Sequence, residues 1–412
     1  MKKIIQFLFG IFLFSVSILN IKAEEFNITS EHVILYNMNE EKVLYELASE
    51  EQAQIASLTK IMTTIVAIEN SNNLEEEVTI PKEAFKGISE YTQVGFKTGD
   101  KATIIDLLYG VMLPSGADAA NALAIHISGS VSNFVDLMNQ KCEELNLENT
   151  HFDNPIGMDS DENYSTASDM AKLLIYSLKN DTFKEIFQAR EYTIASLNKT
   201  LKTTLIGYSR SYGLDITDIT GAKSGFTDGA GLCLASTSTM DDVNYLLITL
   251  GASTQNRSNA VRDTLEIYHY YDSTYSYQTV IKKDQKFKTI PIKWGKEKSY
   301  DIFAEEEVSI YLANDVRKNR IKYTYEGIEE LNYQVKKGTK LGVVNVTYEG
   351  ELLTTYDVYL NKSLKYYHPV LYAVIVISFL IMITSLKAIF TKKKNKKKTL
   401  KGSSKFGGPK KN

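Results

Sequence analysis

A serine and a lysine three residues apart open a largely apolar run, in the tetrapeptide Ser57-Leu58-Thr59-Lys60. Residues three apart lie on one face of a helix, so a helix beginning here places a hydroxyl beside an amine. Nucleophilic catalysis needs this pairing, because a serine hydroxyl is a weak nucleophile until a neighbouring base accepts its proton. The spacing therefore predicts an acyl-transfer site with Ser57 as nucleophile and Lys60 as base.

Two more clusters follow in the chain, Ser115-Gly116 and then Lys223-Ser224-Gly225 at a predicted strand edge. A serine before a helix is usually only an N-cap, although its hydroxyl can also pass a proton to a departing amine. Lys223 can attract a substrate carboxylate that Ser224 hydrogen-bonds, and Gly225 lets a substrate backbone approach as an added strand. Each cluster is weak alone, and the ordered set of three indicates catalysis.

Lys60 must be uncharged to accept a proton, whereas a free lysine titrates near ~10.4. The residues after it are apolar on most sides, which predicts a buried helix over residues 57–69. Burial and a second cation nearby, Lys223, both lower the pKa of a lysine. We therefore expect Lys60 to be proton-poor at working pH.

The three clusters resemble those of the low-molecular-mass penicillin-binding proteins, the serine-type D-alanyl-D-alanine carboxypeptidases of peptidase family S11. The resemblance covers Glu31 to about Tyr270 and includes the segments 113–121 and 221–228. It implies an α/β (α+β) fold of the serine β-lactamase/transpeptidase type, with an antiparallel sheet flanked by helices. It also places Ser115 on the opposite wall of the cleft.

The resemblance further implies an enzyme that removes the terminal D-alanine from peptidoglycan pentapeptide stems through a Ser57 acyl-enzyme. The expected partners are a stem peptide ending in D-Ala-D-Ala and, as inhibitors, β-lactam antibiotics. Lys223, Ser224, Gly225 and Phe226 are the expected substrate-binding residues. The backbone N–H groups of Ser57 and Phe226 are the expected oxyanion hole.

One position departs from the family pattern, because Ala117 stands where the second cluster commonly has asparagine. Asp118 and Asn121 are the candidates to replace its amide in part. A non-catalytic penicillin-sensing or wall-binding protein is one alternative, and Ala117 is its best support. A class A β-lactamase is the other, although the segment 142–149 does not match the spacing of the deacylating glutamate in that family.

Both ends of the chain read as membrane-related segments. Residues 1–23 begin with lysines, continue as an apolar run and end in alanine, which predicts a secretory signal peptide, with a retained membrane anchor as the alternative. Residues 367–390 are mostly apolar and precede a basic tail at 391–412, which predicts one spanning helix with a cytoplasmic C-terminus. We therefore expect a bacterial cell-membrane protein with an extracellular catalytic domain.

Two folded domains are predicted between these ends. Residues 24–272 contain all three clusters among mixed helices and strands, and form the expected catalytic domain. Residues 278–362 show repeated short strands typical of a small β-sandwich. No catalytic cluster falls in this second domain, so we assign it a spacing or wall-contact role, with a purely packing role as the alternative.

The charge and composition of the chain argue against nucleic-acid, metal and cofactor binding. The formal net charge of the chain is −3, but both ends carry lysines and no acidic residue. The residues between the two ends are therefore more acidic than the net charge of the whole chain indicates. An acidic surface repels polyanions, so no nucleic-acid partner is expected. The five histidines lack metal-ligand spacing and the two cysteines are too few for a disulfide framework, so we expect no metal and no cofactor.

Overall fold

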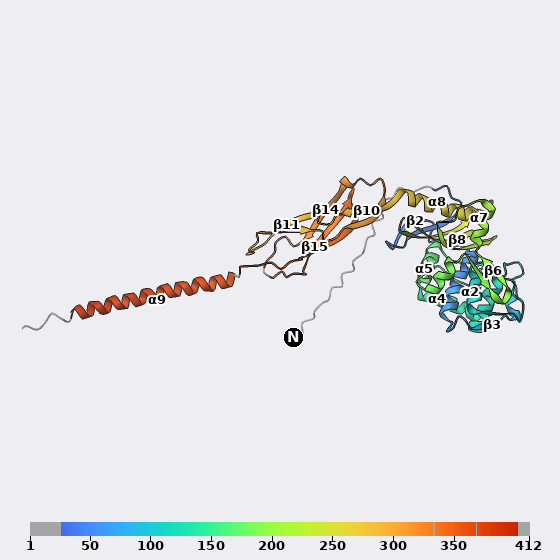
Figure 1. The fold of residues 1–412 in the computed structure, drawn as a ribbon, viewed down its shortest axis with the longest axis horizontal. Helices are drawn as coiled ribbons and strands as arrows, with labels where there is room; N and C mark the ends of the chain where they lie inside the picture. The colour runs from blue at the N-terminus through green and yellow to red at the C-terminus, as the bar shows by residue number, and fades with distance from the viewer. Residues whose placement is uncertain (1–25, 333, 368, 403–412) are drawn as a thin grey trace, which may run out of the picture. The chain divides into compact units, whose positions relative to one another are not determined.

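The computed structural model describes residues 26–332, 334–367 and 369–402, which divide into two compact units after Ser276 (Figure 1). The expected signal peptide and residues 403–412 of the basic tail lie outside the described residues. Each unit is organised around its own buried apolar side chains. The three sequence clusters all fall in the first unit.

A five-stranded antiparallel sheet forms the centre of the first unit, in the order β2-β1-β9-β8-β7. An antiparallel pair formed by β1 and β2 supplies two of its strands. β8 and β9 are buried along almost their whole length, as expected for strands covered on both faces. The strands are β1 (His32–Asn37), β2 (Lys42–Leu47), β7 (Ile219–Thr227), β8 (Gly231–Met240) and β9 (Val243–Ala252).

Helices flank this sheet, as predicted. α8 packs on β8 and β9, whereas α5 packs on β1 and β9 within a helical layer on the other side (Figure 1). Small hairpins, β3 (Glu77–Thr79) with β4 (Lys101–Thr103) and β5 (Glu191–Ile194) with β6 (Lys199–Lys202), extend this layer. The helices are α1 (Thr59–Glu69), α2 (Ile104–Met112), α3 (Ala117–Ser128), α4 (Val131–Glu144), α5 (Ala167–Ser177), α6 (Asp181–Gln188), α7 (Thr204–Tyr212) and α8 (Asn259–Thr274).

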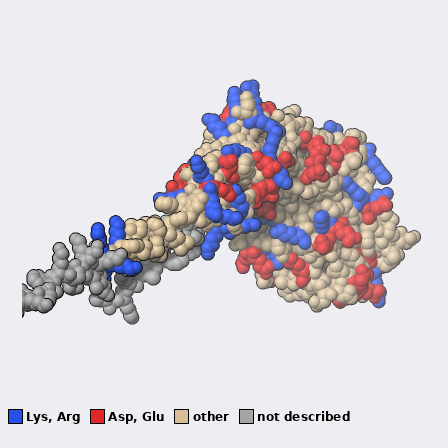
Figure 2. Space-filling view, turned by 60° about the vertical axis from the view of Figure 1, so that its left-hand side comes forward, with Lys and Arg blue, Asp and Glu red and all other residues tan. Residues whose placement is uncertain are grey.

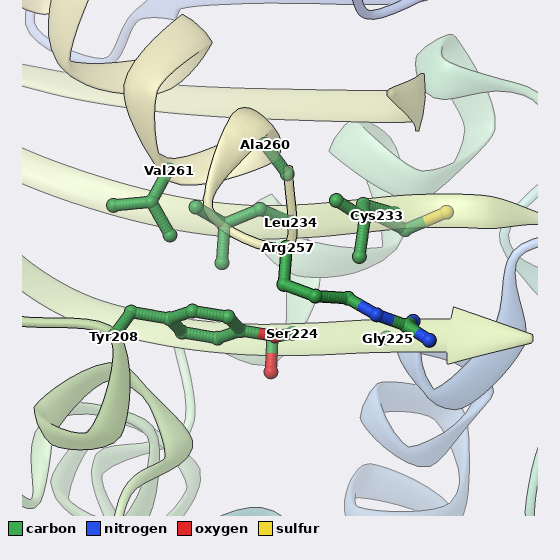
Figure 3. A pocket seen from close by; sticks show the side chains of 9 residues that line it. Tyr208, Ser224, Gly225, Cys233, Leu234, Arg257, Ala260 and Val261 are labelled. Atoms are coloured by element: carbon green, nitrogen blue, oxygen red, sulfur yellow. The ribbon is translucent and has the colours of Figure 1, made fainter. Parts of the chain in front are cut away.

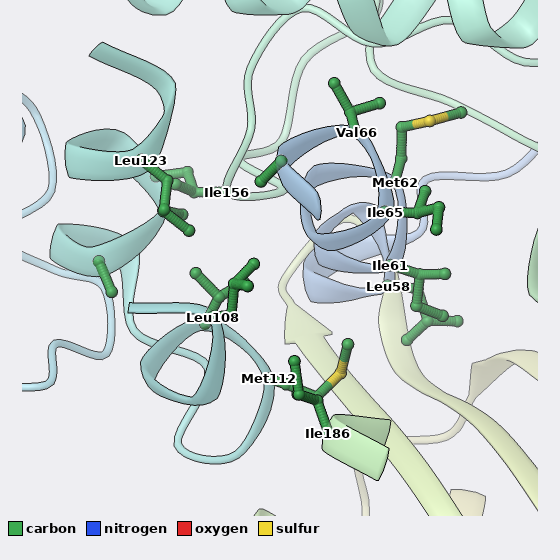
Figure 4. Close-up of a cluster of buried hydrophobic side chains, with 14 of the residues drawn as sticks. Leu58, Ile61, Met62, Ile65, Val66, Leu108, Met112, Leu123, Ile156 and Ile186 are labelled. Atoms are coloured by element: carbon green, nitrogen blue, oxygen red, sulfur yellow. The ribbon is translucent and has the colours of Figure 1, made fainter. Parts of the chain in front are cut away.

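The buried helix α1 is the core element that carries the first cluster. Every residue of α1 except Glu69 is buried, and no side chain caps its N-terminus. Its many β-branched residues have poor intrinsic helicity, so packing against α2, α3 and α6 must hold it (Figure 4). The helix begins at Thr59, later than expected, because residues 56–58 form a 3-10 turn that precedes it.

The second unit is β-rich, as the sequence predicts. Its strands pair as β14-β15-β16, β10-β13 and β11-β12 around two clusters of buried aliphatic side chains. The long helix α9 (Pro369–Gly402) follows, and its segment Val370–Asn395 is long and apolar enough to cross a membrane. The strands are β10 (Tyr275–Ile281), β11 (Lys286–Pro291), β12 (Ser299–Phe303), β13 (Val308–Ala313), β14 (Ile321–Gly327), β15 (Lys340–Tyr348) and β16 (Glu351–Tyr359).

Candidate active site

The proposed nucleophile, Ser57, lies in the 3-10 turn that leads into α1. The preceding residue, Ala56, has a left-handed φ of +47°, a conformation that costs an L-residue about 1 kcal/mol. The loop at Gly157 packs directly onto this turn, because a Cβ built there would lie 1.9 Å from the Ala56 carbonyl oxygen. Close packing therefore holds the nucleophile in a conformation that its sequence does not favour.

Lys60 lies one helical turn from the nucleophile, as the spacing predicts. Its Nζ is 3.1 Å from Ser57 Oγ and also donates a hydrogen bond to the Ile156 carbonyl. The side chain is 1% exposed, and burial lowers the pKa of Lys60 to about 7, an effect that the negative charge of Asp118 opposes. A neutral amine at this distance can accept the hydroxyl proton.

Ser115 connects α2 to α3 and lies against the third cluster. Its φ is +67°, and Gly116 rather than Ser115 occupies the N-cap position of α3. The Ser115 hydroxyl instead accepts a hydrogen bond of 3.0 Å from Lys223 Nζ, across 108 residues of chain. The N-cap interpretation of this serine is therefore wrong, and its hydroxyl faces the Lys223 amine inside the site.

Lys223 is as deeply buried as Lys60, being 1% exposed. Burial and the positive charge of Lys60 hold the pKa of Lys223 well below its usual value. The sequence analysis named burial and this repulsion as causes of the lowered Lys60 pKa; in the structure burial is the leading cause for both amines, and the repulsion is a cause of the Lys223 shift. An anion bound beside Lys223 would favour the protonated form of its amine.

The third cluster lies within β7, whose only partner in the sheet is β8. The strand is therefore an edge, open to an added extended peptide as predicted. Gly225 also meets the nucleophile turn, because a Cβ there would lie 2.9 Å from the Ser57 backbone nitrogen. The absence of a side chain at Gly225 thus lets β7 lie close to Ser57. The next residue along β7 is Phe226, whose N–H is expected in the oxyanion hole.

The sequence analysis did not identify several polar side chains that lie beside β7 (Figure 3). Thr204, at the start of α7, shares a hydrogen bond of 2.7 Å with Ser224 Oγ. The Arg257 guanidinium stacks 3.8 Å over the Phe226 ring and lines a small pocket with Tyr208 and Ser224. Arg257 supplies a cation on the open side of the third cluster, suited to a carboxylate. No sequence pattern marks these residues, since α7 and the β9–α8 connection reach β7 only in the folded chain.

Neither residue proposed to replace the missing asparagine does so. The Asn121 amide donates to the Ala84 carbonyl at 3.0 Å, away from the catalytic groups. The Asp118 carboxylate accepts hydrogen bonds from the backbone N–H groups of residues 94–96, so it fixes that loop and acts on Lys60 through its charge. Ala117 itself is fully buried.

The cysteines offer no competing nucleophile. Cys142 and Cys233 are both buried and free, and burial raises the pKa of each thiol to about 12. A thiol with so high a pKa is almost wholly protonated at neutral pH, and the thiolate is the reactive form.

On the face shown in Figure 2, acidic and basic side chains are interspersed, without a continuous basic stripe for a polyanion.

Comparison with known proteins gives the same assignment as this geometry. Residues 19–254 match the family described as D-alanyl-D-alanine carboxypeptidase, peptidase S11, and residues 275–366 match the C-terminal domain of penicillin-binding protein 5. The chain is 27% identical over 338 residues to D-alanyl-D-alanine carboxypeptidase DacF of Bacillus subtilis, covering 82% of this chain and 86% of that protein.

Two further relatives extend the likeness. D-alanyl-D-alanine carboxypeptidase DacC of Escherichia coli is 31% identical over 331 residues, covering 77% of this chain and 80% of that protein. The crystal structure of penicillin-binding protein 5 from Haemophilus influenzae superposes with a TM-score of 0.62 at 22% identity, over 83% of this chain and 99% of that one. This last match supports the fold.

The chain belongs to the peptidase S11 family of D-alanyl-D-alanine carboxypeptidases and is a serine peptidase of that class. The family and fold predicted from the three clusters are confirmed.

Proposed function

We propose that this enzyme removes the terminal D-alanine from peptidoglycan pentapeptide stems through an acyl-enzyme on Ser57. The observation that carries the proposal is a pair of hydroxyl–amine contacts, Ser57 with Lys60 at 3.1 Å and Ser115 with Lys223 at 3.0 Å. Both amines are buried, and burial favours their neutral forms. This arrangement suits a reaction in which one proton leaves a nucleophile and another reaches a leaving group.

In the proposed acylation, Ser57 Oγ attacks the carbonyl carbon of the penultimate D-alanine as its proton passes to Lys60 Nζ. The backbone N–H groups of Ser57 and Phe226 stabilise the oxyanion. The C–N bond then breaks as the departing amine takes the proton of Ser115 Oγ, and Ser115 recovers a proton from Lys60, which returns to its neutral form. Water then attacks the acyl-enzyme as Lys60 accepts its proton, and Lys60 passes this proton to Ser57 Oγ as the ester C–O bond breaks, which restores the free hydroxyl.

Substrate selection is assigned to the β7 edge. A stem peptide added along β7 would place its terminal carboxylate near Ser224 and Lys223, with Arg257 on the open side. Binding of β-lactam antibiotics follows from the same site, because a strained amide acylates Ser57 but leaves no free amine to depart. The ring therefore stays attached and slows deacylation.

The same proposal includes export and membrane attachment. We assign residues 1–23 to a signal peptide, 24–272 to the catalytic domain, 278–362 to a spacing or wall-contact domain and 367–390 to a single-pass helix. The basic segment 391–412 would then lie in the cytoplasm, which supports an extracellular active site. The apolar stretch Val370–Asn395 supports this topology.

Two measurements on the purified chain test the activity. Mass spectrometry after exposure to a penicillin is expected to show a stable adduct on Ser57, and incubation with a pentapeptide ending in D-Ala-D-Ala is expected to release D-alanine. Ser57→Ala should lose both signals, whereas Ser128→Ala, a serine on α3 that bonds only backbone carbonyls, should keep them. An adduct without D-alanine release would favour the penicillin-sensing alternative. Rapid penicillin turnover would favour a β-lactamase.

A further inference from the structure

The second unit carries the only tryptophan of the chain on an exposed turn. Trp294 lies between β11 and β12, has 55% of its surface exposed, and has a left-handed φ of +58°. A bulky side chain rarely adopts this φ, and an exposed indole adds little to the stability of its own domain. An outlier of this kind points to a role outside the fold.

Backbone hydrogen bonds fasten this turn to the segment that leads into α9. The Tyr367 N–H donates to the Trp294 carbonyl at 2.6 Å, and the Lys296 N–H donates to the Lys365 carbonyl at 2.8 Å, with an isolated β-bridge between these two bonds. The apolar span begins at Val370, three residues after Tyr367. Three residues reach at most about 10 Å, so Trp294 is tied close to the point where the span begins.

This tether sets the depth of the indole in a bilayer. The hydrocarbon core is about 30 Å thick and the whole bilayer about 40–45 Å, so each headgroup layer is roughly 5–8 Å deep. Tyr367 lies within about 10 Å of the first apolar residue of the span, and Trp294 is hydrogen-bonded to it, so the indole is within reach of the headgroup layer. Tryptophan is enriched at that level, because its ring is apolar while its N–H stays hydrogen-bonded.

The charges beside the turn suit the same surface. Lys293, Lys296, Lys298 and Lys365 are all exposed around Trp294. Among the described residues, the last three form no ion pair, whereas Lys293 lies 3.8 Å from Glu330. Lysines near a bilayer each contribute about 1 kcal/mol of attraction to anionic lipid. The loop thus combines an amphipathic ring with several cations.

We propose that the turn at residues 292–298, with Trp294 at its tip, is a membrane-interface contact that docks on anionic lipid headgroups beside α9. The contact rests on the proposed membrane span of α9, and it adds a second attachment point on the folded part of the C-terminal unit. Two points of attachment restrain the tilt of that unit on the membrane, which a single helix and its linker do not.

The lone tryptophan is itself the probe for the test. The full chain is reconstituted into phosphatidylglycerol-containing vesicles, and its emission is recorded with quencher groups placed either near the lipid headgroup or deep in the acyl chain. We expect emission shifted to shorter wavelength than in detergent-free buffer, strong quenching by the shallow label and weak quenching by the deep one. We expect lower quenching in pure phosphatidylcholine vesicles, because the lysines are attracted to anionic headgroups, and equal quenching would overturn the preference for anionic lipid.

A matched variant moves the probe to the opposite end of the same hairpin. Phe303 is 43% exposed and ends β12, four residues beyond Ser299, or about 13 Å further along the strand. The double variant Trp294→Phe, Phe303→Trp should show little lipid quenching. Equal quenching of the two proteins, or a water-exposed Trp294 in vesicles that retain the chain, would overturn the contact. Release of the chain by alkaline extraction would instead refute the span, and the contact with it.

Discussion

The protonation state of Lys60 is expected to control the rate of acylation. Burial lowers its pKa to about 7, so the neutral fraction rises from about one tenth at pH 6 to about nine tenths at pH 8. Only the neutral amine can take the proton of Ser57, 3.1 Å away. The acylation rate should therefore rise about tenfold over this range. The assay is the second-order rate of labelling of Ser57 by a fluorescent penicillin at constant ionic strength.

Substitution of the base gives the magnitude of its contribution. Lys60→Arg retains a cation but removes the base, because arginine stays protonated in proteins. Loss of general-base catalysis should slow acylation about 10²–10⁴-fold, or roughly 3–5 kcal/mol in the barrier. Lys172→Arg, an exposed lysine paired with Asp169 on α5, is the control and should keep the wild-type rate and pH profile. A flat wild-type profile between pH 6 and 8, or an unchanged rate in Lys60→Arg, would refute the reasoning.

Three other substitutions test the surroundings of the site. Gly157→Ala should abolish penicillin labelling and destabilise the fold, because the added Cβ would lie 1.9 Å from the Ala56 carbonyl oxygen. The control is Gly129→Ala, which has a similar φ but open space around the added Cβ. It should lower the free energy of unfolding by only about 1 kcal/mol in a denaturant titration. Lys60→Met should be inactive but more stable than wild type, by up to about 5 kcal/mol below pH 7, where the buried amine must carry its proton. Arg257→Ala should raise KM for a peptide with a free terminal carboxylate, with a smaller change for the same peptide amidated.

The sign of the Lys60 effect follows from linkage. The folded pKa of about 7 lies below the usual 10.5, so the unfolded chain binds more protons between these values. The stability penalty is therefore full below pH 7 and is relieved as the pH rises toward 10.5. A Lys60→Met variant whose stability advantage grows with pH would contradict this. Penicillin labelling that survives in Gly157→Ala would contradict the prediction for that variant. An equal rise in KM for the free and the amidated peptide would contradict the prediction for Arg257→Ala.

The sequence by itself determined the local parts of this protein. The Ser57–Lys60 contact follows from the spacing of the two residues, and the span in α9 follows from its length and hydropathy. These features depend on neighbours within a few residues, so periodicity and composition reveal them. The three clusters and their order could also be recognised from the sequence, because each cluster is a short run of consecutive residues.

Only the tertiary structure decided what surrounds those motifs. Ser115 contacts Lys223 across 108 residues, and Lys60 contacts the Ile156 carbonyl across 96, so neither partner is marked by local spacing. The left-handed turn at Ala56 arises from packing against Gly157, which no residue type specifies alone. The apolar run indicated the direction of the Lys60 pKa shift, and burial in the folded chain lowers that pKa to about 7. Long-range contacts thus bring a recognisable set of residues into one site, with a hydroxyl–amine contact between Ser115 and Lys223 and the Arg257 guanidinium beside β7.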